Sequence, residues 1–154
     1  MNKCVILQVE DDDRDVFFLS RAFKVAGIEN LVKVANDGQQ AIDYLSGAGE
    51  FCDRHRFPLP GLIILDLKLP RRNGFEVLDW LRKRSGLCCL TVIVFSSSPL
   101  EREIERAYEL GANSYVVKPH ETEDLQRFAK ALRDYWLQFH AFSVVQENEV
   151  VAAQ

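Results

Sequence analysis

The chain has 154 residues, four cysteines and a formal net charge of −4. A chain of this length can bury a core without metal or disulfide staples, so we expect one main domain. The acidic balance leaves no basic patch and argues against nucleic-acid binding. No apolar run is long enough to span a membrane. The cysteines form no C-x-x-C pair, which predicts free thiols in the reducing cytoplasm.

Short apolar or β-branched runs alternate with segments of helical period along the chain. The runs predict strands over residues 4–9, 31–35, 62–67, 91–95 and 114–117. The intervening spacing predicts helices over 13–26, 38–45, 75–81 and 100–108, and a long last helix over 121–139. Three runs are continuously apolar, which is typical of strands covered on both faces. The fold class is therefore α/β, a doubly wound five-stranded parallel sheet with five helices.

Ligand sites in such sheets form beyond the carboxyl ends of the strands. Glu10 and Asp11 follow the first predicted strand, and Asp66 follows the third. Ser96 follows the fourth strand and Lys118 the fifth. If the first and third strands are neighbours, we expect three carboxylates, a hydroxyl and an ammonium at one rim of the sheet.

Three carboxylates held close together repel one another, and a divalent cation relieves that repulsion. Mg²⁺ suits such a site, because carboxylates, water and phosphate oxygens are its usual ligands. A carboxylate beside the metal can attack a phosphoryl group and form an aspartyl phosphate. This transfer needs mainly positioning and charge neutralisation, which Lys118 and Ser96 could supply at the phosphoryl oxygens.

Each of these residues also has an ordinary structural interpretation. An acid at a strand end is commonly a solvated turn residue, and the serines at 96–98 could cap the next helix. What favours a site is their coincidence at four strand ends. In the same acidic run, we interpret Asp12 and Asp13 as an N-cap and a favourable charge for the first helix, with Asp15 adding to that charge.

The ordered motifs VEDD, LIILDLKLP, RNGFEVL, VIVFSSS and LGANSYVVKP resemble those of two-component response regulator receiver domains, over about residues 3–137. The resemblance implies a CheY-like, flavodoxin-like fold with strand order 2-1-3-4-5 and a receiver domain over residues 1–140. It implies that Asp66 accepts a phosphoryl group from a histidine kinase, so that the chain is a signalling domain and not an enzyme. It also implies a cis Lys118–Pro119 bond.

The resemblance further assigns roles at the site. The implied Mg²⁺ ligands are oxygen donors: Glu10, Asp11, Asp66 and the main-chain carbonyl of Lys68. Lys118 would contact the phosphoryl group, and Ser96 and Tyr115 would form the conformational switch. Glu10 stands where many receivers have Asp, and Ser96 where Thr is commonest.

Two further stretches resemble the small receivers that partner phytochrome-type histidine kinases. One is the insert SGAGEFCDRHRFPLPG, which could equally be a solvated loop, and the other is the aromatic extension DYWLQFHAF. The tail over residues 141–154 is too short for a DNA-binding domain and is interpreted as an interface or as disordered. The extra aromatic residues predict either a homodimer through the last helix or a tail folded onto its own domain.

Two other functions are compatible with an acidic rim. One is a small Mg²⁺-dependent phosphohydrolase that works through an aspartyl phosphate. Against it, Lys68 occupies the place where haloacid-dehalogenase-like enzymes carry a second acid. The other is a phosphorylation-independent scaffold, which leaves the acidic site without a purpose.

Overall fold

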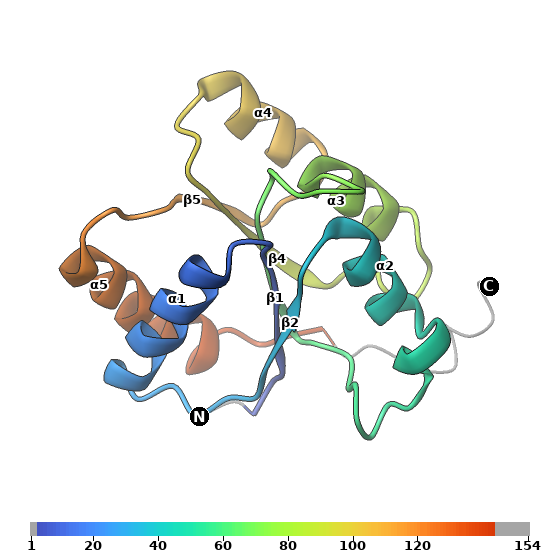
Figure 1. The fold of residues 1–154 in the computed structure, drawn as a ribbon, viewed down its shortest axis with the longest axis horizontal. Coiled ribbons are helices and arrows are strands. Elements are labelled where there is room, and N and C mark those ends of the chain that lie inside the picture. The colour runs from blue at the N-terminus through green and yellow to red at the C-terminus, as the bar shows by residue number, and fades with distance from the viewer. Residues whose placement is uncertain (1–2, 144–154) are drawn as a thin grey trace.

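A five-stranded parallel sheet forms the centre of the protein in the computed structural model, which describes residues 3–143 (Figure 1). The strand order is β2-β1-β3-β4-β5, as the resemblance implies. The strands are β1 (Ile6–Val9), β2 (Val32–Ala35), β3 (Leu62–Leu65), β4 (Thr91–Ser96) and β5 (Ser114–Val117).

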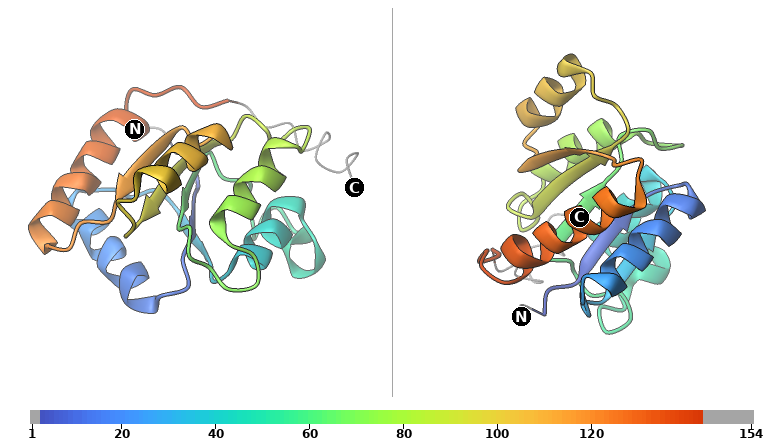
Figure 2. Two further views of the ribbon diagram at one scale, coloured as in Figure 1. Left: turned by 90° about the horizontal axis from the view of Figure 1, so that it is seen from above. Right: turned by 90° about the vertical axis from the view of Figure 1, so that its left-hand side faces the viewer.

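Helices cover both faces of the sheet (Figure 2). On one face, α1 (Asp13–Val25) contacts α5 (Thr122–Leu132). The other face carries α2 (Gly38–Ser46), α3 (Gly74–Arg82) and α4 (Glu101–Glu109). The predicted doubly wound arrangement is therefore confirmed.

The apolar run of β3 explains how one strand serves two cores. Successive side chains of a strand point to opposite faces. Leu62 and Ile64 accordingly join the apolar cluster beneath α1 and α5. Ile63 and Leu65 join the cluster beneath α2, α3 and α4. All four side chains are buried, which is what a continuously apolar strand predicts.

The register of the parallel strands brings their carboxyl ends to one rim. Val9 is paired with Leu65, and Ser96 is paired with Val117. These strands therefore end at nearly the same level, so residues at or directly after their carboxyl ends lie at this rim.

The last helix predicted over residues 121–139 is helical from Thr122 to Leu137, but its α period does not continue to the end. α5 ends at Leu132, and a π-helical turn (Arg133–Leu137) follows it. A π turn has more residues than an α turn and so rotates the later side chains to a new face. Leu137 is buried as a result, whereas Phe139, which continues the predicted stripe, is 81% exposed.

The insert before β3 packs on the domain and is not a solvated loop. It contains a short 3₁₀ helix (Gly49–Cys52), and the rings of Phe51 and Phe57 lie 5.0 Å apart. Both rings also contact Tyr44 of α2. The Arg54 guanidinium donates to the carbonyl oxygens of Tyr44 (2.8 Å) and Leu45 (3.0 Å), where the last carbonyls of a helix lack partners.

The bond between Lys118 and Pro119 is trans. No peptide bond among residues 3–143 is cis, so the expected cis Lys118–Pro119 bond is wrong. The trans form is the lower in free energy for an X–Pro bond unless its surroundings select cis.

Within residues 3–143, no helix has the length and apolar character needed to cross a bilayer. The tail beyond residue 143 lies outside the described residues.

Candidate phosphorylation site

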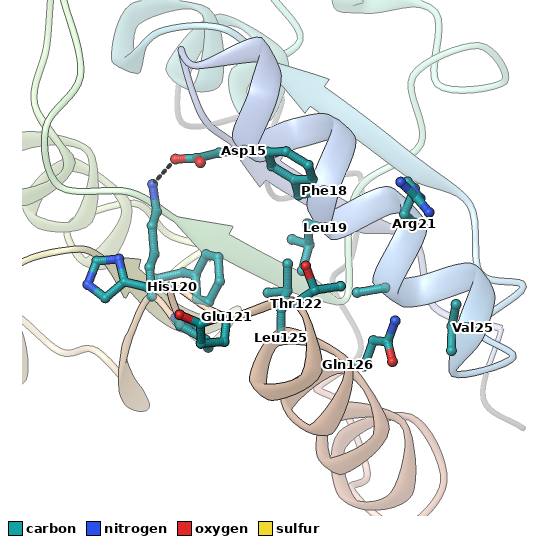
Figure 3. A pocket seen from close by; sticks show the side chains of 14 residues that line it. Asp15, Phe18, Leu19, Arg21, Val25, His120, Glu121, Thr122, Leu125 and Gln126 are labelled. Atoms are coloured by element: carbon teal, nitrogen blue, oxygen red, sulfur yellow. Dashed lines mark hydrogen bonds and ion pairs between the residues drawn. The ribbon is translucent and has the colours of Figure 1, made fainter.

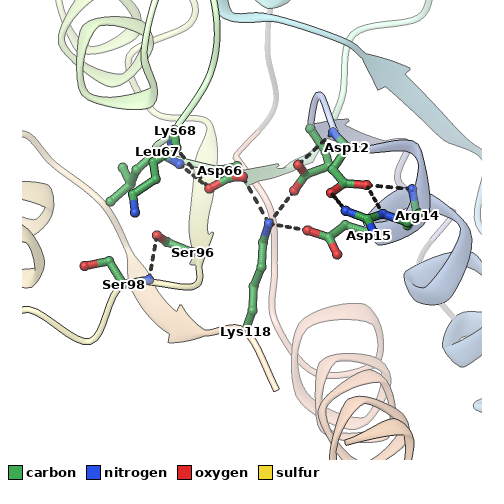
Figure 4. Close-up of polar contacts among 10 residues, drawn as sticks. Asp12, Arg14, Asp15, Asp66, Leu67, Lys68, Ser96, Ser98 and Lys118 are labelled. Carbon is green, nitrogen blue, oxygen red and sulfur yellow. Dashed lines mark hydrogen bonds and ion pairs between the residues drawn. The ribbon is translucent and has the colours of Figure 1, made fainter. Parts of the chain in front are cut away.

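The rim predicted from the sequence is assembled around Lys118 (Figure 4). Its Nζ lies 2.6 Å from Oε2 of Glu10 and 3.0 Å from Oδ2 of Asp66. Glu10 and Asp66 are almost fully buried, and they follow the neighbouring strands β1 and β3. The ammonium therefore sits between two buried carboxylates and neutralises part of their repulsion.

Asp15 is a third partner of Lys118, with its Oδ2 2.8 Å from Nζ. From the sequence, we expected Asp15 only to add charge at the helix end. It lies on the first turn of α1, directly after the acidic loop. Side chains of a helix lean toward its N-terminus, so an acid in this turn can reach back to the rim. That geometry was the available signal.

Glu10, Asp11 and Asp66 form a cluster that could hold a metal ion. One carboxylate oxygen from each lies within 4.8 Å of the others. An all-carboxylate donor set fits Mg²⁺ or a similar hard cation. Lys68 lies in the loop after Asp66, with its backbone amide 3.4 Å from Oδ1 of Asp66.

The surroundings of the rim shift the pKa values of Glu10 and Lys118. Burial raises the pKa of Glu10 to about 7, and the charge of Asp66 adds to the rise, while the hydrogen bond from Lys118 opposes it. Burial alone would lower the pKa of Lys118, but the hydrogen bonds to Asp15 and Glu10 and the charge of Asp66 outweigh it. The net effect raises the pKa of Lys118, so the ammonium is firmly charged.

The predicted switch residues are linked through Ser98. The Ser96 hydroxyl is fully buried and accepts a hydrogen bond from the amide of Ser98 (3.2 Å). The Tyr115 hydroxyl donates to the carbonyl oxygen of Ser98 (2.8 Å), and its ring packs against the apolar cluster beneath α2–α4. Ser98 itself is not the N-cap of α4, which is Leu100, although its hydroxyl accepts from the Leu100 amide.

A pocket of about 280 Å³ lies beside the rim, between α1 and the segment that leads into α5 (Figure 3). Phe18 and Leu19 line it from α1, and Leu125 lines it from α5. Asp15 and Lys118 also line it, so their ion pair connects the pocket to the acidic rim.

The response regulator receiver domain family model matches residues 6–130. The chain belongs to this family. This chain is 32% identical to the response regulator Rcp1 of Synechocystis over 134 residues, which cover 87% of this chain and 89% of Rcp1. It is a response regulator of two-component signalling.

Solved structures agree with this assignment. The response regulator RPA3017 in red light signaling of R. palustris superposes with a TM-score of 0.87 at 33% identity, and covers 92% of this chain and 99% of its own. The phosphorylated cyanobacterial phytochrome response regulator RcpA gives a TM-score of 0.84 at 30% identity with the same coverage. A structure of Rcp1 is a Mn²⁺-bound form. This receiver is therefore similar to phytochrome response regulators in both sequence and fold.

Proposed function

We propose that this receiver accepts a phosphoryl group on Asp66 from a histidine kinase and thereby changes its contacts with other proteins. The observation that carries the proposal is the position of the Lys118 ammonium, 3.0 Å from Asp66 and within the same rim as a cluster of metal-type ligands. A nucleophilic carboxylate, a fixed cation and oxygen donors are the parts that phosphoryl transfer needs.

The transfer follows from the residues around Asp66. The Leu67 amide donates to Oδ1 of Asp66 (2.7 Å), which fixes the carboxylate. A carboxylate oxygen forms the new bond to phosphorus while the bond from phosphorus to the histidine nitrogen of the kinase breaks. The leaving nitrogen takes the electron pair of that bond, and the other ring nitrogen keeps its proton, so the histidine departs as neutral imidazole. Lys118 is placed to contact a phosphoryl oxygen and balance its charge. The receiver acts here as a phosphoacceptor and not as an enzyme on a separate substrate.

We assign the metal site to Mg²⁺, held by oxygen donors: Glu10, Asp11, Asp66 and the main-chain carbonyl of Lys68. When bound, the ion neutralises the carboxylates and the phosphoryl oxygens. The close carboxylate oxygens support this assignment, as does the Mn²⁺-bound form of Rcp1.

Ser96 and Tyr115 form the switch in this proposal. A phosphoryl group adds a charge of about −1.5 to −2 near Asp66. The Ser96 hydroxyl would turn to it and release the Ser98 amide. Because Ser98 also accepts the hydrogen bond of Tyr115, this change would reach the exposed side of β5.

The partner is a histidine kinase, and the similarity to RPA3017, RcpA and Rcp1 favours one of the phytochrome type. The kinase must deliver its phosphohistidine to Asp66 from the rim. Phe17 and Phe18 of α1 are 56% and 48% exposed, and Phe18 lines the pocket that adjoins the rim. Exposed aromatic side chains of this kind favour a protein contact. All four cysteines are free thiols, which supports the cytoplasm as the compartment.

A homodimer through the last helix and its extension is part of the proposal. Tyr135 is 55% exposed and Phe139 is 81% exposed, which supports an interface. Trp136 and Phe142 instead pack against the cluster beneath α1 and α5. Sedimentation velocity tests the dimer; a monomer at high concentration, with and without beryllofluoride, would exclude it.

Phosphorylation with acetyl phosphate and Mg²⁺ tests the function. Intact mass should show one labile phosphate on the wild type and on the surface control Asp124→Asn, and none on Asp66→Asn. No modification with any donor would favour a scaffold. Rapid turnover of varied phosphate esters would favour a phosphohydrolase.

A further inference from the structure

Lys118 uses its full hydrogen-bonding capacity within the rim. An ammonium has three N–H donors, and three carboxylates accept from this one: Glu10 at 2.6 Å, Asp15 at 2.8 Å and Asp66 at 3.0 Å. Any new acceptor, such as a phosphoryl oxygen, must therefore replace one of the three.

The three partners are not equivalent. Glu10 and Asp66 belong to the carboxylate cluster, whose oxygens are those that a metal ion and a phosphoryl group would engage. Asp15 lies outside that cluster, on the first turn of α1 and at the end of the adjacent pocket (Figure 3). Its side chain is 40% exposed, whereas the side chains of Glu10 and Asp66 are 3% and 8% exposed.

The backbone and the ammonium of Lys118 also contact β4. The Lys118 amide donates to the carbonyl oxygen of Ser96 (2.8 Å), and its Nζ lies 5.9 Å from the centre of the Phe95 ring. The Phe95 ring in turn stacks on Phe128 of α5 at 5.0 Å. The backbone of Lys118 is thus tied to the sheet, and Asp15 is the partner of its ammonium that lies on a helix.

We propose that Asp15 is a positioning residue for phosphoryl transfer. It holds the Lys118 ammonium at the rim while Glu10 and Asp66 are engaged by the metal ion and the phosphoryl group. The donor that faces Asp66 in this structure passes to the phosphoryl oxygen, and the hydrogen bond to Asp15 remains. This inference rests on the proposed function, since it names a residue that serves the reaction at Asp66.

The first test needs neither metal nor phosphate. The ¹H–¹⁵N signal of the Lys118 ammonium, assigned by its loss in Lys118→Arg, should broaden or disappear in Asp15→Ala because its protons exchange faster. Asp13→Ala is the matched control, because Asp13 is an exposed acid of the same helical turn and is not a partner of Lys118. An unchanged Lys118 signal in Asp15→Ala would overturn the inference.

The second test is a double-mutant cycle on phosphorylation by acetyl phosphate at saturating Mg²⁺. Asp15→Ala should slow the reaction about tenfold, the effect of losing one charge-assisted hydrogen bond to a positioned group. Asp13→Ala should stay within about twofold of wild type, a change too small to count as a lost contact of this kind. In the Lys118→Ala background, Asp15→Ala should have no further effect, since coupled residues are not additive. Equal effects in both backgrounds would show that Asp15 acts by its charge or its helix alone.

Failure of the two proposals can be told apart. If the wild type takes up no phosphate, the proposed function fails, and the ammonium signal still decides whether Asp15 positions Lys118. Asp15→Glu keeps the carboxylate and serves as the conservative variant. If the wild type is phosphorylated, the positioning role is wrong when Asp15→Glu is phosphorylated no faster than Asp15→Ala and the Lys118 signal is intact in both variants. Circular dichroism and the urea midpoint establish that each variant is folded.

Discussion

The side chain of Asp12 turns back onto α1, where it accepts a hydrogen bond from the backbone amide of Arg14 at 2.9 Å. It also pairs with the exposed Arg14 guanidinium. Asp12 is therefore the N-cap of the helix, although it directly follows Asp11, a member of the carboxylate cluster.

This division predicts opposite outcomes for neighbouring substitutions. Asp11→Ala should abolish Mg²⁺-dependent phosphorylation and leave the free energy of unfolding nearly unchanged. Asp12→Ala should remain phosphorylatable, and its free energy of unfolding should fall because the cap is lost. Phosphorylation assays and urea unfolding of both variants check this, and a loss of phosphorylation in Asp12→Ala would contradict it.

The raised pKa of Glu10 predicts an unusual pH dependence for the metal-free protein. An exposed glutamate titrates near pH 4.5, and Glu10 in the folded state titrates near 7. Between these values the folded state binds more protons than the unfolded state, so the free energy of unfolding falls as pH rises through this window, by at most about 3.5 kcal/mol. Urea unfolding from pH 4 to 8 measures it. In Glu10→Gln this component should be absent.

The link from Ser96 to Tyr115 predicts that the switch can be separated from phosphorylation. Ser96→Ala removes the hydroxyl that would turn to the phosphoryl group, so a beryllofluoride-induced change in the Tyr115 ring signals should be lost or strongly reduced. Mg²⁺ affinity should change little. The control is Ser97→Ala, an exposed neighbour. An undiminished response in Ser96→Ala would show that another group carries the switch.

Close packing at Gly74 predicts that a single methyl group disturbs the site. A Cβ at Gly74 would clash with the carbonyl oxygen of Asp66 and lie 2.7 Å from the Cα of Leu67. Gly74→Ala should therefore cost about 1–3 kcal/mol and slow phosphorylation. In Gly49→Ala the Cβ meets nothing within 4 Å, so the change should cost only about 1–2 kcal/mol through its positive φ and leave phosphorylation unaffected.

The π-helical turn predicts which of two apolar side chains near the end of the chain stabilises the fold. Leu137→Ala should cost about 2–5 kcal/mol, because it leaves a cavity in the cluster beneath α1 and α5. Phe139→Ala should change the free energy of unfolding by less than about 0.5 kcal/mol. Urea unfolding measures the loss of stability in each variant. A larger loss in Phe139→Ala than in Leu137→Ala would contradict the π turn and favour the continuous α-helix expected from the sequence.

The fold and most of the rim follow from local rules applied to the sequence. Continuous apolar runs identified the strands, and the parallel topology then brought Glu10, Asp66 and Lys118 to one edge. The pairing of Asp15 with Lys118 was missed, because an acid in the first turn of a helix is ordinarily explained by the charge of the helix end. The pairing depends on how far the side chain of Lys118, which follows β5, reaches across the rim. The sequence contained no signal for the π turn, because a helical period cannot show where the backbone departs from it.

The ion pairs of Lys118 join parts of the chain that are synthesised far apart. Glu10 precedes it by 108 residues and Asp66 by 52. During synthesis, the acids of β1, α1 and β3 therefore emerge well before the cation that balances them, and their mutual repulsion opposes early docking of these segments. Contacts of such long sequence separation form slowly. Closure of the rim by β5 should thus be a late folding event, and a chain competent for phosphorylation is one whose sheet is complete.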